Sequence, residues 1–174
     1  MFTVTETAFI AAPLARCFAL STDVELVQRT LDMRLVGGVT SGHIELGSRV
    51  VWRGWKFGLP TEHHTLITLL EPPHAGHLGD PAAHFEGQSV AWFEDSQEKG
   101  RFASFRHMHL FRETNGVTQL EDHVTFSLPF GLLGRLAARL LLAPHIRKLA
   151  RQRFRLLQRI AESGEEHHSV TRQT

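Results

Sequence analysis

The segment "RFASFRHMHLFRETNGVTQLEDHVTF", residues 101–126, holds two alternating runs of residues on either side of an Asn-Gly pair. Successive side chains of a β-strand point to opposite faces, so every second residue shares a face. In the first run that face carries two aromatic rings and two imidazoles: Phe105, His107, His109 and Phe111. Asn-Gly between alternating runs is the strongest short-range signal for a two-residue hairpin turn. The segment therefore predicts an antiparallel hairpin with two histidines on an apolar face.

The position of the turn also predicts the register of the hairpin. A two-residue turn at Asn115-Gly116 pairs Thr114 with Val117, and counting back places His109 opposite Asp122. One face then consists of Phe105, His107, His109, Phe111, Leu120, Asp122, Val124 and Phe126. The other face is polar and suits water: Ser104, Arg106, Arg112, Gln119, Glu121, His123 and Thr125. We therefore expect the histidines inside the protein, with an aspartate facing one of them.

The composition limits the class of protein. The chain has 174 residues, of which 42% are hydrophobic and 21% charged, which is typical of one globular domain. Nineteen basic and eighteen acidic residues leave a net charge near zero, so we expect no nucleic-acid partner. A single cysteine, Cys17, the lack of a signal-peptide pattern and the lack of a membrane-spanning apolar run indicate a cytoplasmic protein. The sequence does not indicate an oligomeric state.

The remaining sequence predicts a strand, two short helices, several strands and a long final helix. The opening run 2–10 alternates, and Pro13 suits the first turn of a helix that is followed by a second short helix with Thr22 or Asp23 as its cap. Further strands carry the three tryptophans, and Pro72 and Pro73 are expected to end one of them. The Gly-, Pro- and His-rich stretch that follows reads as a long loop.

The final helix follows Pro129 and Gly131 and is amphipathic. Its first stripe consists of Leu133, Leu136, Ala137 and Leu140, and Pro144 is expected to kink the helix or reset its phase. The stripe continues with Ile146, Leu149, Arg153, Leu156 and Ile160. Between Gly131 and Ala161 there are eight basic residues and no acidic one. This charge is a solvated face in the simpler interpretation and a contact with an anionic partner, namely membrane headgroups, RNA or an acidic protein, in the alternative.

The order of elements and several local patterns resemble one superfamily. "LGSRVVWR", "FGLP", "ITLLEPP", "WFEDSQEKGRFASFRHMHLF" and "LEDHVTFSLPFGLLGRLAARLL" are similar to stretches of the SRPBCC superfamily, which includes START-like proteins, polyketide cyclases/dehydrases and birch-pollen-allergen-like proteins. The resemblance implies an α+β helix-grip fold, in which a curved antiparallel sheet with two short helices and a long C-terminal helix encloses a hydrophobic cavity. It implies one domain over residues 1–161, followed by a polar tail, 162–174, that we expect to be disordered. The segment 74–88 is longer than the family pattern and is expected at the cavity entrance or the sheet edge.

The resemblance makes the inner face of the hairpin a cavity wall. The residues then expected to contact a ligand are Phe93, Asp95, Phe105, His107, Phe111, Val124, Phe126, Leu136 and Leu140. The pair of His109 and Asp122 has three interpretations: a buried hydrogen-bonded pair, an acid/base or ligand-orienting pair, or part of a zinc or iron site. We include no metal and no cofactor in the predicted site.

Two functions fit these observations. The first is the binding of a small hydrophobic molecule, such as a lipid, polyketide, aromatic compound or isoprenoid, without changing it. The second is a cyclase or dehydratase in which His109 and Asp122 move protons in a dry pocket. The sequence contains no nucleophile elbow, phosphate loop or dinucleotide motif that would add weight to catalysis, and one fold can serve either function. We therefore expect binding, with the enzyme as the alternative.

Overall fold

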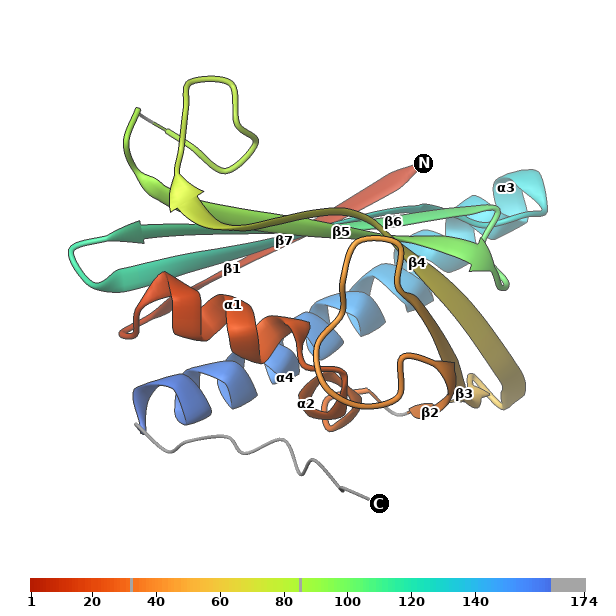
Figure 1. The fold of residues 1–174 in the computed structure, drawn as a ribbon. Coiled ribbons are helices and arrows are strands. Elements are labelled where there is room, and N and C mark those ends of the chain that lie inside the picture. The colour runs from red at the N-terminus through yellow and green to blue at the C-terminus, as the bar shows by residue number, and fades with distance from the viewer. Residues whose placement is uncertain (32, 85, 164–174) are drawn as a thin grey trace, which may run out of the picture.

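One antiparallel sheet of seven strands, in the order β1-β7-β6-β5-β4-β3-β2, forms the frame of the protein (Figure 1). The computed structural model describes residues 1–31, 33–84 and 86–163. Along the chain the elements are β1 (Phe2–Ile10), α1 (Leu14–Thr22), α2 (Val24–Gln28), β2 (Met33–Gly38), β3 (Arg49–Lys56), β4 (Leu59–Ala75), β5 (Ser89–Lys99), β6 (Ser104–Thr114), β7 (Val117–Ser127), α3 (Gly131–Ala137), the π-helical turn η1 (Ala138–Leu142) and α4 (Ala143–Glu162). The predicted fold class, a curved antiparallel sheet with two short helices and a long final helix, is confirmed.

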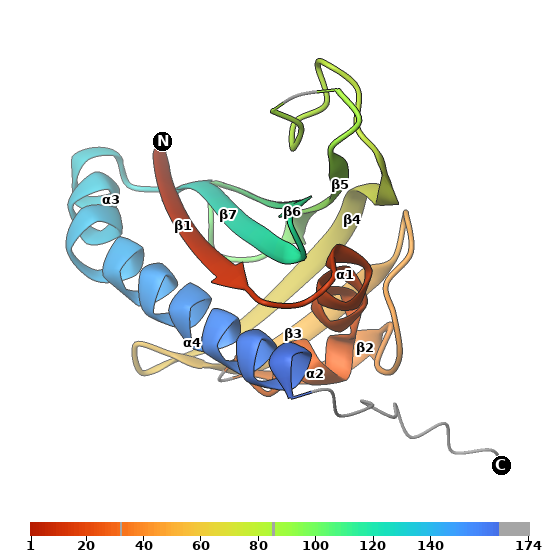
Figure 2. The ribbon, with the colours of Figure 1, turned by 90° about the vertical axis from the view of Figure 1, so that its left-hand side faces the viewer.

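The sheet curves around the last helix. Figure 2 shows α4 running along the open side of the curved sheet, with α1 and α2 on the same side. α4 packs against β1 and against α1. The largest apolar core lies between these helices and the inner face of the central strands, around Phe18, Phe93, Phe111 and Phe154. The concave face of the sheet is therefore the inside of the molecule.

The hairpin of β6 and β7 has the predicted register. Thr114 pairs with Val117 and His109 pairs with Asp122. Asn115 and Gly116 both adopt a left-handed backbone conformation, with φ of 53° and 76°, as a type I′ turn requires. The same alternation places Asp95 on β5 opposite His107, and Phe93 opposite His109. The turn thus brings three central strands into a register that collects polar side chains on the concave face.

Asp23 is the residue that caps the second helix. Its carboxylate accepts hydrogen bonds from the backbone N–H groups of Glu25 and Leu26. Thr22, the alternative cap, instead donates its hydroxyl to carbonyl oxygens of the preceding helix. The prediction of a cap at this point is confirmed, and the structure assigns it to the aspartate.

The first part of the final helix turns its large residues outward, contrary to the prediction. Leu136 and Leu140 are 55% and 60% exposed, whereas Gly134 and Ala138 are buried. A Cβ on Gly134 would lie 1.9 Å from the carbonyl oxygen of Pro129, so the small residues allow this close approach. α3 lies beyond the end of the sheet (Figure 2), so no sheet surface is available to cover its leucines. The predicted contact of Leu136 and Leu140 with the cavity is therefore wrong.

A π-helical turn marks the expected change of phase at Pro144. η1 ends at Leu142, and the proline stands within the first two positions of α4. Proline has no backbone N–H to donate, so the helical hydrogen-bond ladder must change its spacing just before it. From this point the amphipathic pattern runs as predicted, and Ile146 packs against the apolar cluster of the sheet.

The long strand β4 does not end at the two prolines. It continues to Ala75, and a shift of register between Glu71 and His74 accommodates Pro72 and Pro73. Two prolines fit at such a bulge because the irregular ladder does not require their missing N–H groups. The prediction that the prolines stop the strand was wrong, since the bulge satisfies the pairing on either side.

The segment between β4 and β5 covers the outer face of the sheet and does not reach the cavity entrance. Ala82 is buried against Val90, Trp92 and Leu110, whose side chains lie on the convex face. Figures 1 and 2 show this segment on the side of the sheet opposite α4. Arg112, predicted to face water, is buried beneath it and contacts the His84 imidazole. The tail prediction falls largely on residues 164–174, which lie outside the described residues.

Candidate functional site

The concave face of the sheet and α4 enclose a cavity of about 450 Å³. A volume of this size is typical of pockets that bind small molecules. Most of its wall is apolar and comes from the sheet and from α2, for example Val24, Val50, Trp52, Ile67, Phe93 and Val124. A cluster of buried charged and imidazole side chains lies at one place, where β5, β6 and β7 meet α4. Other polar side chains, such as Lys56, His63 and Arg101, line the wall from β3, β4 and the β5–β6 connection. The cavity therefore has a largely apolar wall and one polar end, formed by the cluster.

Three buried charged or polar side chains form the core of this polar end. Nδ1 of His109 lies 2.6 Å from Oδ1 of Asp122, directly across the hairpin. Arg153, which α4 contributes, donates from Nη1 to both carboxylate oxygens of Asp122, at 3.0 and 2.8 Å. All three residues are at most 7% exposed. A carboxylate buried this deeply needs such partners, because an unpaired charge in the interior is very costly.

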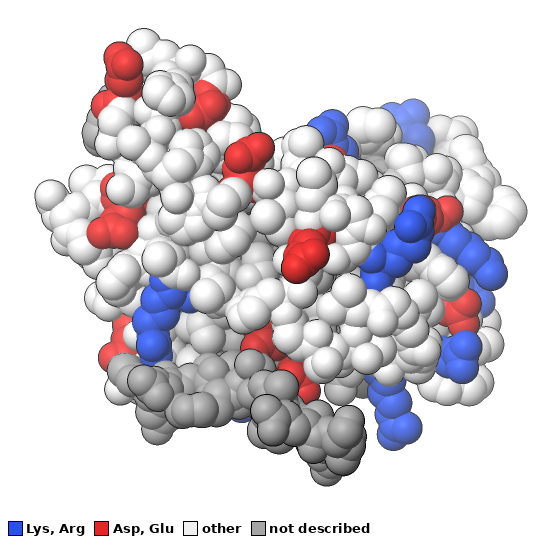
Figure 3. Space-filling view, in the orientation of Figure 1, with Lys and Arg blue, Asp and Glu red and all other residues white. Residues whose placement is uncertain are grey.

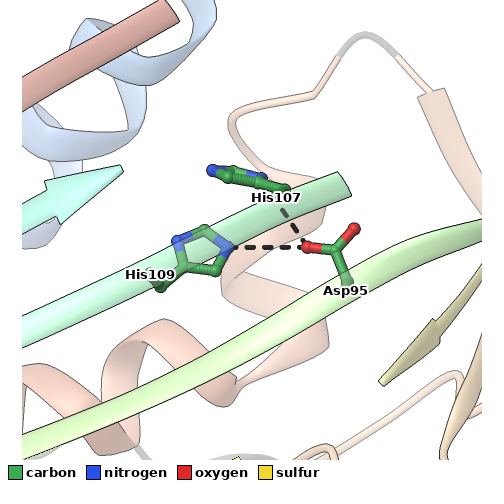
Figure 4. Close-up of side chains that lie close together, drawn as sticks. All are labelled: Asp95, His107 and His109. Carbon is green, nitrogen blue, oxygen red and sulfur yellow. Dashed lines mark ion pairs between the residues drawn. The ribbon is translucent and has the colours of Figure 1, made fainter. Parts of the chain in front are cut away.

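Asp95 and His107 complete the polar end on the side facing the cavity. Oδ2 of Asp95 lies 3.5 Å from Nε2 of His109 and 3.6 Å from Nδ1 of His107 (Figure 4). The two imidazoles lie against each other, with ring centroids 3.8 Å apart, and the His109 ring also stacks on Phe93. Alternation on β6 puts both histidines on one face, and pairing with β5 puts Asp95 beside them. Within the described residues, these three side chains could hold a metal ion.

The ionisation of the cluster follows from burial and neighbouring charge. Burial opposes ionisation of Asp122, but Arg153 and the two imidazoles outweigh it and hold the pKa of this carboxyl well below its usual range. Burial likewise opposes the ionisation of Asp95, yet His109 and His107 lower its pKa. Burial, with His107 nearby, lowers the pKa of His109 despite the adjacent Asp122. Burial and the neighbouring charges thus favour ionised carboxylates at Asp95 and Asp122 and oppose a charged His109.

The opposite end of the cavity is apolar and open. Phe57 and Leu59, at the turn between β3 and β4, line the cavity and are also more than half exposed. Leu141 of η1 also lines the cavity and is also more than half exposed. The Phe57 ring contacts the His145 ring, with centroids 5.3 Å apart, so the hairpin tip touches the start of α4. We call this region, the β3–β4 turn together with α3 and η1, the mouth.

The structure places the sequence-predicted site residues in three locations. Seven of them line the cavity: Phe93, Asp95, Phe105, His107, His109, Asp122 and Val124. Phe111 and Phe126 face inward but are fully buried in the cores on either side of it. Leu136 and Leu140 lie on the outer surface, as described above. The hairpin residues gather as the register predicted, whereas the helical residues do not.

Arg153 and His63 are the main residues that sequence reasoning missed. Arg153 stands on the apolar stripe of the final helix, and a charged residue at such a position is a signal that a buried partner exists. It was grouped with the other basic residues of the helix as surface charge. His63 on β4 lines the cavity beside Phe102 and Phe105, and burial lowers the pKa of its imidazole. The adjacent pair His63-His64 has no metal-ligand spacing, so the sequence does not single it out.

The fold has clear counterparts among solved structures. An aromatase/cyclase from Streptomyces sp. R1128 superposes with a TM-score of 0.65 at 16% identity, over 92% of this chain and 93% of that one. A START superfamily protein from Mycobacterium smegmatis gives 0.60 at 14% identity, over 92% and 97%. Norcoclaurine synthase from Thalictrum flavum gives 0.60 at 7% identity, over 95% and 88%. No protein-family model and no curated protein matches the sequence. The chain shares the helix-grip fold of these structures, and at these identities the likeness concerns the fold alone.

In the part of the chain that the structure describes, none of the helices combines the length and the apolar character needed to cross a bilayer.

Proposed function

We propose that the protein binds a small, largely apolar ligand in the cavity between the sheet and α4. The supporting observation is the cavity itself, which is apolar along its body and has one buried polar end. An apolar body favours a lipid, polyketide, aromatic compound or isoprenoid, because burial of its surface supplies the binding free energy. A single polar end would fix the orientation of such a ligand.

The polar end favours a ligand whose head group accepts hydrogen bonds. Nη2 of Arg153 is buried and has no hydrogen-bond partner among the described residues, and the buried Nε2 of His107 has only the Asp122 carboxylate, at 3.5 Å, within reach. Buried donors without a partner carry a desolvation cost, which a ligand oxygen reaching this end would remove. A carbonyl, carboxylate or phenol oxygen meets this requirement. We therefore propose a ligand with an apolar body and one oxygen-bearing head group.

Proton transfer in the same cavity is the second candidate. The short contact with Asp122 favours the tautomer of His109 that carries its proton on Nδ1, because the carboxylate can only accept. The lone pair on Nε2 then points toward Asp95 and the cavity side, which is the arrangement of a general base oriented by an aspartate. A cyclase or dehydratase would use His109 in this way, with Asp122 holding the ring. Turnover of the bound molecule would distinguish this function from binding alone.

We also propose that the ligand enters through the mouth from the surface of an anionic membrane. The mouth exposes a series of large apolar residues along α3 and η1: Phe130, Leu132, Leu133, Leu136, Leu140 and Leu141. Phe57 and Phe130 are held in a left-handed backbone conformation, with φ of 53° and 73°, which is strained for a bulky residue. Aromatic side chains displayed at such a cost, on a contiguous apolar surface, mark an interaction site.

The charge around the mouth favours lipid headgroups over a neutral partner. Arg135 and Arg139 are exposed on the same helix, and Figure 3 shows Lys and Arg gathering at the end of the molecule where α3 and the β3–β4 turn lie. Apolar residues flanked by arginines are the pattern of a segment that lies in the interface of an anionic bilayer. A partner protein or a second copy would be the alternative occupants, and both are separable by experiment.

Native mass spectrometry of freshly purified protein, with a matched pair of variants, tests the binding function. Ala150 lines the cavity, so Ala150→Phe should fill part of it, whereas Gln152→Phe adds the same ring on the exposed side of α4. We expect a co-purified apolar molecule on the wild type and on Gln152→Phe and at least a tenfold lower occupancy on Ala150→Phe. Equal occupancy of the two variants would show that the ligand lies elsewhere. Release of an altered molecule would favour the enzyme.

A further inference from the structure

Asp95, His107 and His109 present three possible metal-ligand atoms to one point on the cavity wall. One such atom from each residue lies within 4.8 Å of the other two. Figure 4 shows the carboxylate of Asp95 directed at both imidazoles, which come from the neighbouring strand. The arrangement is fixed by strand pairing, since His107 and Asp95 are direct cross-strand partners. Central strands of a sheet are rigid supports, so the three groups are preorganised.

Two hydrogen-bond acceptors face each other at this point. In the tautomer with the proton on Nδ1, which the carboxylate of Asp122 at 2.6 Å favours, Nε2 of His109 carries a lone pair. Its nearest neighbour is the negatively charged Oδ2 of Asp95, at 3.5 Å. A lone pair and a carboxylate oxygen repel each other unless a cation lies between them. Arg153 does not supply it, because its guanidinium meets His109 at Nδ1, 2.9 Å away and remote from Asp95.

The spacing of the three groups suits a metal ion. Ligand atoms at about 2.1 Å from a tetrahedral zinc lie about 3.4 Å from each other. The observed separations from Asp95 Oδ2 are 3.5 Å to His109 and 3.6 Å to His107. Asp122 stands behind His109, as in the carboxylate–histidine–metal arrangement that orients metal-binding imidazoles and increases their basicity. The fourth coordination position would face the cavity.

We propose that Asp95, His107 and His109 bind one divalent transition-metal ion, of which Zn²⁺ is the best match to two imidazoles and one carboxylate. The ion would present an open coordination position to the oxygen of a ligand in the cavity and polarise it. This inference concerns the protein without its ligand, so it stands or falls separately from the proposed function.

Zinc binding to the full-length, untagged chain tests the proposal. After removal of metal with a chelator, ZnCl₂ is titrated by calorimetry, and CoCl₂ is followed by visible absorption. We expect one ion per chain, with intense Co²⁺ bands of a four- or five-coordinate site. Asp95→Asn and His107→Gln should each weaken zinc binding tenfold or more, as loss of one ligand does, while His123→Gln on the outer face should not. Circular dichroism confirms that each variant is folded.

A background variant excludes the histidines of the tail as the source of binding. His167→Gln/His168→Gln should bind zinc as the wild type does. The proposal is overturned if the wild type binds no ion, or if Asp95→Asn and His107→Gln both retain wild-type affinity. Loss of binding in the background variant would also overturn it. In each of these cases the cation between the acceptors is a proton, and the cluster is a hydrogen-bonded network only.

Discussion

The two ends of the cavity reverse the usual distribution of residues in a globular protein. At the polar end, Asp122 and Arg153 are charged and almost fully buried. At the mouth, Phe57 and Phe130 are bulky and apolar, and they are 60% and 83% exposed. Burying charges and exposing apolar surface both cost stability, so neither end is explained by folding alone. Under the proposed function, the sheet supplies stability, while the polar end recognises the ligand and the mouth contacts the membrane.

The largest expected effect comes from removing the cation of the polar end. Arg153→Met leaves Asp122 buried without its main partner, so it should destabilise the fold by about 3–5 kcal/mol. Urea unfolding measures this loss. Arg155→Met, an exposed position two residues along the same helix, should change stability by less than about 0.5 kcal/mol. Similar effects of the two substitutions would show that Arg153 is no more than surface charge.

Removal of both charges sharpens this prediction. Arg153→Met/Asp122→Asn eliminates the unpaired carboxylate, so it should recover part of the stability that Arg153→Met loses. A double variant as unstable as the sum of the two single variants would show that the ion pair is not what stabilises this end.

The mouth should behave in the opposite way, with function lost and stability kept. Leu132→Ser/Leu136→Ser removes two exposed side chains, so the free energy of unfolding should stay within about 0.5 kcal/mol of the wild type. Binding to vesicles that contain phosphatidylserine should fall tenfold or more in a flotation assay, because each buried leucine contributes about 1.5–3 kcal/mol.

An exposed aromatic far from the mouth provides the control. Phe9→Ser, on β1, should leave vesicle binding unchanged. Two results would contradict entry from an anionic membrane. One is equal binding of the wild type to neutral and to phosphatidylserine vesicles, and the other is vesicle binding that the double leucine substitution leaves unchanged. A dimer mass in solution for the wild type, together with a monomer mass for the leucine variant, would instead identify a second copy as the occupant of the mouth.

The smallest expected effect is a pH dependence of the free energy of unfolding that originates at His63 on the cavity wall. Burial lowers the pKa of His63, so between the folded value and about 6.5 the unfolded chain binds more protons than the folded one. Stability should therefore decrease as the pH falls from 7 toward 5. His63→Gln should flatten part of this profile in thermal melts, and His109, whose pKa burial also lowers, should account for the remainder.

Acid should destabilise the protein again at lower pH for a different reason. The lowered pKa values of Asp95 and Asp122 mean that these carboxylates stabilise the fold above the usual aspartate pKa, near 3.9. That stability is lost as the pH falls through their folded values. A single transition below pH 4, with no earlier loss, would contradict the assignment of His63 as a buried neutral group.

Local signals in the sequence were sufficient for the sheet and for most of the polar end. The Asn115-Gly116 turn fixes a register, and alternation then places His107, His109 and Asp122 without any further information. The same signals fail for α3, because helical periodicity identifies a stripe but not whether a surface exists to cover it. Arg153 was missed for a related reason, since its partner lies 31 positions earlier and meets it only through tertiary packing.

The segment between β4 and β5 shows a third limit of local reasoning. Its Gly- and Pro-rich composition indicates a loop, but composition carries no information about which face of a sheet the loop covers. Ala82 and the burial of Arg112 became interpretable only with the neighbouring strands in place.

The hairpin turn at Asn115-Gly116 has a consequence for the order of folding. A two-residue turn forms within microseconds, so His109 and Asp122 meet early, whereas Arg153 arrives only when the last helix docks. Until then the Asp122 carboxylate has no cation within reach, and desolvating it opposes closure of the sheet over it. We expect the cavity to remain hydrated in the folding transition state and to close in the same step that docks α4. The buried ion pair would then couple closure of the interior to docking of the final helix, so that the two occur in the same folding step.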